Sequence, residues 1–142
     1  RFARVPGFVV SWTSGAADGA PVSIVEPVES ESDKEAIEKI INRTTHIQSS
    51  DYFSETMEGM EKLDGICMLF IAVGESLKNI DKITKGSLLA KHPEIDWAGV
   101  MGFRDIIVHH YFNIDSEQIF WICSHELRPL SEVIKKILRD LA

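Results

Sequence analysis

The sequence feature that most constrains the fold is a stretch from about Ser54 to Ile80 in which apolar residues recur every three or four positions. That spacing puts the apolar side chains on one side of an α-helix, whereas a half-buried strand would alternate them. No proline interrupts the stretch. Its glycines, Gly59, Gly65 and Gly74, each weaken a helix by about 1 kcal/mol relative to alanine, so they indicate close contacts with neighbouring helices.

Further helices are predicted on both sides of this stretch. Ser32 followed three residues later by Glu35 forms a capping box, which predicts the start of the first helix. Residues 49–54 predict a turn before the second. Pro93 and Asp96 predict the start of a third helix, because proline and a capping carboxylate are typical of a helix N-terminus.

The third helix is expected to fray near Asn113, and a fourth is expected to begin behind Asp115. Pro129 kinks or restarts the chain because proline cannot donate the internal hydrogen bond, and a last amphipathic helix follows it. No alternating strand pattern follows residue 32. Residues 32–142 are therefore predicted to form an all-α domain, an up-and-down bundle of four or five helices.

Residues 1–31 differ from the remainder, with several glycines and prolines followed by an acidic run. We interpret them as a tail: a natural extension, a remnant of expression cloning, or an arm that binds a partner. Residues 8–12 could form a short strand, but a strand without a partner is not stable.

The composition narrows the class of protein. A formal net charge of −7 argues against a general nucleic-acid coat, because such binding depends on many lysine and arginine contacts with phosphate. Cys67 and Cys123 both lie in apolar contexts and lack the spacing of a zinc site or a disulfide framework. No apolar run reaches the roughly 18 residues of a membrane span, and no signal-peptide pattern is present. We expect a cytoplasmic protein without a metal, a cofactor or a membrane contact.

Residues 102–115 are the first place to look for chemistry. This otherwise apolar segment contains Arg104, Asp105, His109, His110 and Tyr111. Buried charge is costly unless it has a partner or a task. On a helix at roughly 100° per residue, Arg104 falls in the middle of the apolar face, whereas Asp105 and His109 share the opposite face with small residues. That second face suits close approach by another helix or another subunit.

The segment reads R-x4-H-x-Y, with Arg104, His109 and Tyr111 in the key positions and with Pro93, Trp97 and Gly102 upstream. This pattern resembles the HepT-like branch of the HEPN superfamily, small four-helix proteins. The resemblance covers roughly residues 33–142, including the Gly74-Glu75 pair and the region from Trp121 to Pro129.

The resemblance implies a metal-independent endoribonuclease that works as a homodimer, with two copies of the motif lining a cleft between subunits. Arg104 would bind the scissile phosphate, since a guanidinium can hold two phosphate oxygens in a fork. His109 would act as the general acid or base on the ribose 2′-hydroxyl or the leaving oxygen, since histidine titrates near neutral pH. Such catalysis contributes about 10²–10⁴-fold.

The resemblance also implies a partner. HepT-like toxins belong to prokaryotic toxin–antitoxin pairs, in which a minimal nucleotidyltransferase antitoxin transfers AMP to the motif tyrosine and silences the toxin. Tyr111 would be that acceptor. Asp105 stands where many relatives have asparagine and could pair with His109 four residues later. Such a pair would favour the charged imidazolium, so we leave the acid and base roles of His109 open.

Structural explanations of the same residues compete with these roles. Arg104 could form a salt bridge with a carboxylate such as Glu75, His109 could only pack, and Tyr111 could be a core residue with a bonded hydroxyl. A metal site formed by His109 and His110 is disfavoured because neighbouring helical side chains diverge and no third ligand is evident. The chain could then be a non-catalytic HEPN scaffold that binds a nucleotide or a partner, or a plain helical dimerisation module.

The spacing of the motif adds one constraint. Arg104 and His109 are five positions apart, so a regular helix separates them by roughly 140°. Either the helix loosens before His109 and turns the imidazole back toward Arg104, or the copy on a second subunit completes the site. We expect both to contribute.

Overall fold

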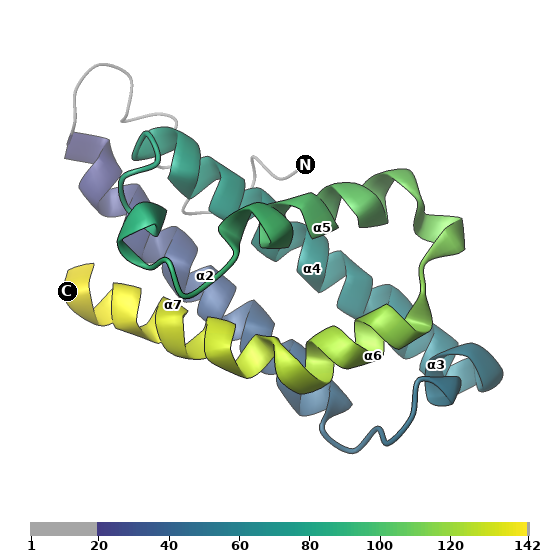
Figure 1. The fold of residues 1–142 in the computed structure, drawn as a ribbon. Coiled ribbons are helices and arrows are strands. Elements are labelled where there is room, and N and C mark those ends of the chain that lie inside the picture. The colour runs from purple at the N-terminus through teal and green to yellow at the C-terminus, as the bar shows by residue number, and fades with distance from the viewer. Residues whose placement is uncertain (1–19, 142) are drawn as a thin grey trace.

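The computed structural model describes residues 20–141, with side chains for residues 31–140. Within that range every regular element is a helix, which confirms the predicted all-α fold. The elements in chain order are α2 (Ala20–Thr44), α3 (Asp51–Glu55), α4 (Met57–Ile83), the 3₁₀ turn η2 (Leu89–Lys91), α5 (Trp97–His109), the 3₁₀ turn η3 (Tyr111–Asn113), α6 (Ser116–His125) and α7 (Leu127–Leu141) (Figure 1). The strand considered for residues 8–12 lies outside the described residues.

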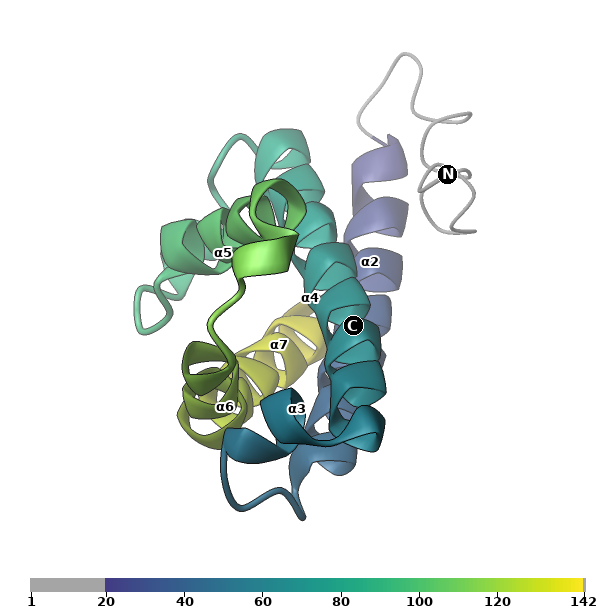
Figure 2. The same ribbon diagram turned by 90° about the vertical axis from the view of Figure 1, so that its right-hand side faces the viewer.

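The helices run up and down in a bundle. α2 and α4 lie side by side in opposite directions, α7 packs along the other side of α2, and α5 packs on α4 (Figures 1 and 2). The short helix α3 closes the end of the bundle next to α6. No helix in the described part of the chain is both long and apolar enough to cross a membrane.

The core lies between α2, α4 and α7. Ile37 of α2, Leu77 of α4 and Ile134 of α7 are almost completely buried, and each contributes about 1.5–3 kcal/mol relative to an exposed side chain. Cys67 and Cys123 are buried in the same core, as predicted. Burial raises the pKa of the Cys67 thiol to about 11 and that of Cys123 to about 12, so both remain protonated packing residues.

The helix caps predicted at Asp96 and Asp115 are confirmed. The Asp96 side chain accepts a hydrogen bond from the amide of Gly99 at 3.0 Å, and Asp115 accepts one from the amide of Glu117 at 2.9 Å. These bonds satisfy free amide groups at the starts of α5 and α6. Pro129 lies in the first turn of α7, where its missing N–H costs little, which agrees with the predicted restart.

The predicted start of the first helix is wrong. α2 runs without a break from Ala20 to Thr44, so Ser32 lies inside it. A capping box needs free amide groups at a helix end, and here the preceding residues are already helical. An ion pair of 3.5 Å between Lys34 and Glu31 spans the expected boundary. The helical part of the chain thus extends into the segment that we had interpreted as a tail.

The predicted turn at 49–54 is also wrong in part, because it contains the one-turn helix α3. Phe53, only 1% exposed, anchors this turn in the core. The second long helix begins at Met57, not near Ser54, because Thr56 caps it by accepting a hydrogen bond of 2.8 Å from the amide of Gly59. At its other end α4 continues to Ile83, three residues beyond the predicted end.

α5 is attached to the bundle chiefly through α4. On its other side a cavity of about 730 Å³ separates it from α6 and α7. Apolar side chains of α5 and α6 line this cavity, among them Phe103, Ile106, Trp121 and Ile122. The helix that carries the motif is therefore fixed on one side only.

Candidate active site

The motif helix crosses α4 at a glycine. A Cβ added to Gly74 would lie 2.4 Å from the Cβ of Arg104 and 3.0 Å from its Cγ. Real Cβ atoms do not approach that closely, so only glycine fits at this crossing without a shift. The close contact that the glycines of the second helix predicted is confirmed here, and it fixes the position of Arg104 relative to α4.

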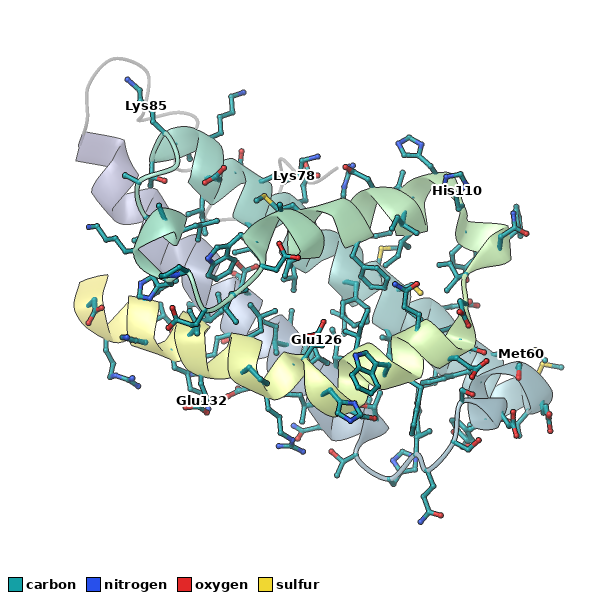
Figure 3. The ribbon with its side chains drawn as sticks, viewed as in Figure 1. Met60, Lys78, Lys85, His110, Glu126 and Glu132 are labelled. Atoms are coloured by element: carbon teal, nitrogen blue, oxygen red, sulfur yellow. The ribbon has the colours of Figure 1, made fainter. Side chains whose placement is uncertain are left out.

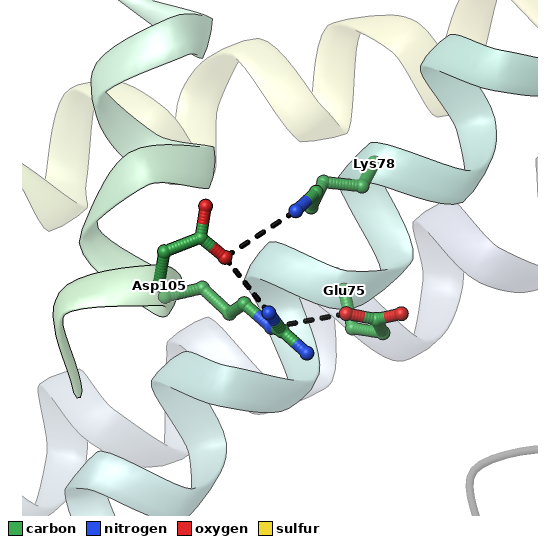
Figure 4. Close-up of polar contacts among 4 residues, drawn as sticks. Glu75, Lys78 and Asp105 are labelled. Carbon is green, nitrogen blue, oxygen red and sulfur yellow. Dashed lines mark hydrogen bonds and ion pairs between the residues drawn. The ribbon is translucent and has the colours of Figure 1, made fainter. Parts of the chain in front are cut away.

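Two carboxylates hold the guanidinium of Arg104. Its Nη1 donates a hydrogen bond of 2.7 Å to Oδ1 of Asp105, and its Nε lies 3.0 Å from Oε1 of Glu75 (Figure 4). The Nε contact is an ion pair by distance without hydrogen-bond geometry. The salt bridge with Glu75 that we considered from the sequence is therefore present. Among the described residues the Nη2 group makes no hydrogen bond or ion pair, so it can bind a ligand oxygen.

Asp105 also binds a second cation, Lys78 of α4. Its Oδ1 also accepts from Nζ of Lys78 at 3.3 Å (Figure 4). The hydrogen bonds from Arg104 and then Lys78 hold the pKa of the Asp105 carboxyl below its usual value. Asp105 contacts these two cations and not His109, its expected partner, because fully charged groups on both helices lie within its reach. Arg104, Lys78, Glu75 and Asp105 together carry no net charge.

His109 has a different environment. It is the last residue of α5, and its side chain is exposed and makes no hydrogen bond or ion pair among the described residues. The helix is regular up to His109 and departs from helical geometry only at His110, where φ is −132° and ψ is 35°. The expected loosening before His109 is therefore wrong, and the imidazole is not turned back toward Arg104. His110 lies at the surface at this end of α5 (Figure 3).

Tyr111 begins η3, beyond the end of the motif helix. Its hydroxyl donates a hydrogen bond to Asp64 of α4, 47 residues earlier in the chain. This hydrogen bond, followed by partial burial, raises the pKa of Tyr111 to about 12. The side chain remains 40% exposed. Tyr111 is thus a surface residue with a bonded hydroxyl, not a core residue.

The structure brings some candidate residues together and keeps others apart. Arg104 and Asp105 contact α4 near Glu75, whereas Tyr111 contacts it at Asp64. Those two positions are eleven residues apart on the helix, which corresponds to about 16 Å along α4. Asp64 was not predicted from the sequence, because no local signal distinguishes it from the other acidic residues of that helix. Among the described residues, no group of three or more His, Cys, Asp or Glu could hold a metal ion.

Comparison with known proteins identifies the family. A family model described as "Ribonuclease HepT-like" matches residues 34–137. No solved structure matches the chain. "Putative RNase MJ0127" of Methanocaldococcus jannaschii is 26% identical over 89 residues, 63% of this chain and 70% of the relative.

Two further relatives carry similar names. "Putative RNase MJ1216" of the same organism is 23% identical over 107 residues, 75% of this chain and 82% of the relative. "Putative RNase TTE0752" of Caldanaerobacter subterraneus subsp. tengcongensis is 30% identical over 67 residues, 47% of this chain and 56% of the relative. The resemblance inferred from the motif and the predicted ribonuclease class are confirmed, and the chain belongs to the HepT-like ribonuclease family.

Proposed function

We propose that this chain is a metal-independent endoribonuclease that acts as a homodimer, with Arg104 and His109 as its catalytic residues. The proposal rests on one observation: these two side chains lie on the same helix but have different environments. Arg104 is fixed by two carboxylates, whereas His109 is exposed and unpaired among the described residues. A regular helix keeps the two side chains roughly 140° apart, so a second subunit supplies the missing half of each site.

In this mechanism Arg104 binds the scissile phosphate. The Nη2 group meets the phosphate oxygens, while Glu75 and Asp105 hold the rest of the guanidinium in place. His109 of the other subunit transfers a proton at the 2′-hydroxyl or at the leaving oxygen. An imidazole has one nitrogen that can donate a proton and one that can accept it, so the same side chain can serve either step.

Exposed apolar residues around the motif support a dimer. Ile106 and Val108 on α5, Met68 on α4 and Phe112 in η3 are all exposed, and Phe112 is 97% exposed. Large apolar side chains that remain exposed in one subunit are candidates for burial in an interface. A second copy of the chain would cover these residues and bring its own His109 close to the motif.

We further propose that the protein is the toxin of a prokaryotic toxin–antitoxin pair and acts in the cytoplasm. A minimal nucleotidyltransferase antitoxin would transfer AMP to the hydroxyl of Tyr111, which is 40% exposed and two residues from His109. The bulky, negatively charged AMP at this position would obstruct RNA and repel its phosphates.

Cleavage of RNA in the presence of a metal chelator tests the catalytic assignment. The expected result is cleavage by the wild-type dimer and a loss of about 10²-fold or more for His109→Ala, because general acid–base catalysis contributes about 10²–10⁴-fold. His110→Ala is the matched control, since the adjacent histidine is also exposed. This substitution should leave the rate nearly unchanged. Equal cleavage by wild type and His109→Ala would contradict the assignment.

A non-catalytic scaffold is the second candidate. The observation in its favour is the neutral cluster of Arg104 with Glu75, Asp105 and Lys78, since a guanidinium with two carboxylate partners can be purely structural. This candidate predicts stable co-purification with a nucleotidyltransferase or binding of a nucleotide, without RNA cleavage and without a growth defect on expression.

A further inference from the structure

The chain contains two tyrosines, and the hydroxyl of each donates a hydrogen bond to a carboxylate. Tyr52 donates to Oε1 of Glu58, six residues away, at 2.8 Å. Tyr111 donates to Oδ1 of Asp64, 47 residues away. The first bond is local to the junction of α3 and α4. The second joins η3 to α4 and places a carboxylate on the hydroxyl of the motif tyrosine.

Asp64 also differs from the other carboxylates near the motif. Glu75 and Asp105 are both paired with cations, whereas Asp64 has no ion pair among the described residues. Its charge is not neutralised by a cation, so its carboxylate remains a competent proton acceptor. It is exposed on α4 and can return a proton to water.

We propose that Asp64 is the general base that activates the Tyr111 hydroxyl during transfer of AMP. The inference rests on the proposed function, in which Tyr111 is the AMP acceptor. It assigns a catalytic step to a residue of the protein that is modified, not to the transferase alone.

The Tyr111 oxygen forms a bond to the α-phosphorus of ATP, which the transferase binds, and the bond from that phosphorus to the pyrophosphate oxygen breaks. Pyrophosphate leaves with the electron pair of that bond. The phenolic proton passes to the Asp64 carboxylate and then to solvent, which regenerates the base.

Two properties support this role. A general base must lie within hydrogen-bond reach of the proton that it removes, and Asp64 already accepts that hydrogen bond. The pKa of Tyr111 is raised to about 12, so the phenol is protonated at neutral pH and is a weak nucleophile unless a base removes its proton during the attack.

The test uses the full chain, its nucleotidyltransferase partner, Mg²⁺ and ATP labelled on the α-phosphate. Initial rates of label transfer are measured for wild type, Asp64→Asn and Asp64→Ala, with the site of modification identified by mass analysis. Asparagine can still accept the tyrosine hydrogen bond but cannot take up its proton. We expect both variants to lose about 10²-fold or more. Glu58→Gln, which changes the carboxylate of the other tyrosine pair, should match wild type.

The pH profile separates catalysis from positioning. For Asp64→Asn the rate of AMP transfer should rise with pH as the phenol ionises without a base. For wild type the rate should change little with pH around neutrality. Melting curves of each variant check that it is folded. If Asp64→Asn matches wild type in rate and profile, the base assignment is overturned while Tyr111 remains the acceptor. If wild type receives no AMP on Tyr111, the acceptor proposal fails and the role of Asp64 fails with it.

Discussion

Arg104 and Tyr111 contact the same helix, α4, in two different ways. At the Arg104 end the backbones approach so closely that residue 74 must be glycine, and two carboxylates and a lysine complete the contact. At the Tyr111 end one hydrogen bond to Asp64 holds a partly exposed side chain. The difference indicates that Arg104, which we propose binds the phosphate, is built into the packing of the bundle. Tyr111, the proposed AMP acceptor, is held only by a hydrogen bond that the transfer reaction can break.

The largest effect on stability is expected from a substitution at the close contact between Gly74 and Arg104. In Gly74→Ala the new Cβ meets the Cβ of Arg104 at 2.4 Å, and overpacking of this kind costs about 1–3 kcal/mol. Thermal unfolding should therefore begin several degrees lower, since each kcal/mol shifts Tm by about 2–8 °C. RNA cleavage should fall as well, because Arg104 is displaced.

Gly65→Ala on the same helix is the control for that change. The nearest atom to its new Cβ is Nη1 of Arg43 at 3.8 Å, an ordinary contact. Alanine favours a helix over glycine by about 1 kcal/mol, so this variant should melt at the wild-type temperature or above. Equal destabilisation by both substitutions would show that the close crossing at Gly74 does not position Arg104.

A smaller effect on stability is expected from removal of the hydrogen bond between Tyr111 and Asp64. Tyr111→Phe removes the hydrogen bond to Asp64, and because the side chain is 40% exposed, the free energy of unfolding should fall by at most about 1 kcal/mol. The folded pKa of about 12 lies above the ordinary 10.0. The stabilisation is thus present below pH 10 and lost as pH rises toward 12.

Chemical denaturation of wild type and Tyr111→Phe across that pH range measures this effect. The difference between the two proteins should shrink between pH 10 and 12. Tyr52→Phe removes the bond to Glu58 and serves as a comparison at a site without a role in the motif. If Tyr111→Phe lowered the free energy of unfolding by several kcal/mol, the Tyr111 contact with α4 would be as structural as the Arg104 contact. The difference between the two contacts would then disappear.

The sequence predicted the parts of the fold that depend on local signals. The all-α class followed from spacing, and Asp96 and Asp115 cap the helices where expected because a cap depends on residues two or three positions away. The burial of Cys67 and Cys123 followed from their apolar neighbours. The start of α2 was missed because Ser32 and Glu35 fit a helix interior as well as a helix start.

The site was predictable only in part. The residue types and spacing of the motif pointed to Arg104, His109 and Tyr111, but their contacts depend on the packing of α4 against α5 and η3. Lys78 lies 27 residues from Asp105, and Asp64 lies 47 residues from Tyr111. No local pattern brings such pairs together. The expected pairing of Asp105 with His109 is wrong because it was inferred from α5 alone, without the cation that α4 supplies.

Mixed dimers test whether each active site combines Arg104 of one subunit with His109 of the other. Arg104→Ala and His109→Ala proteins, each inactive alone, are combined under conditions that allow subunit exchange, and exchange is verified by native mass spectrometry. Half of the dimers should be mixed, each with one intact composite site, so about a quarter of the wild-type RNA cleavage should return. No recovery despite complete exchange would contradict the account, because it would place both residues of a working site on one chain.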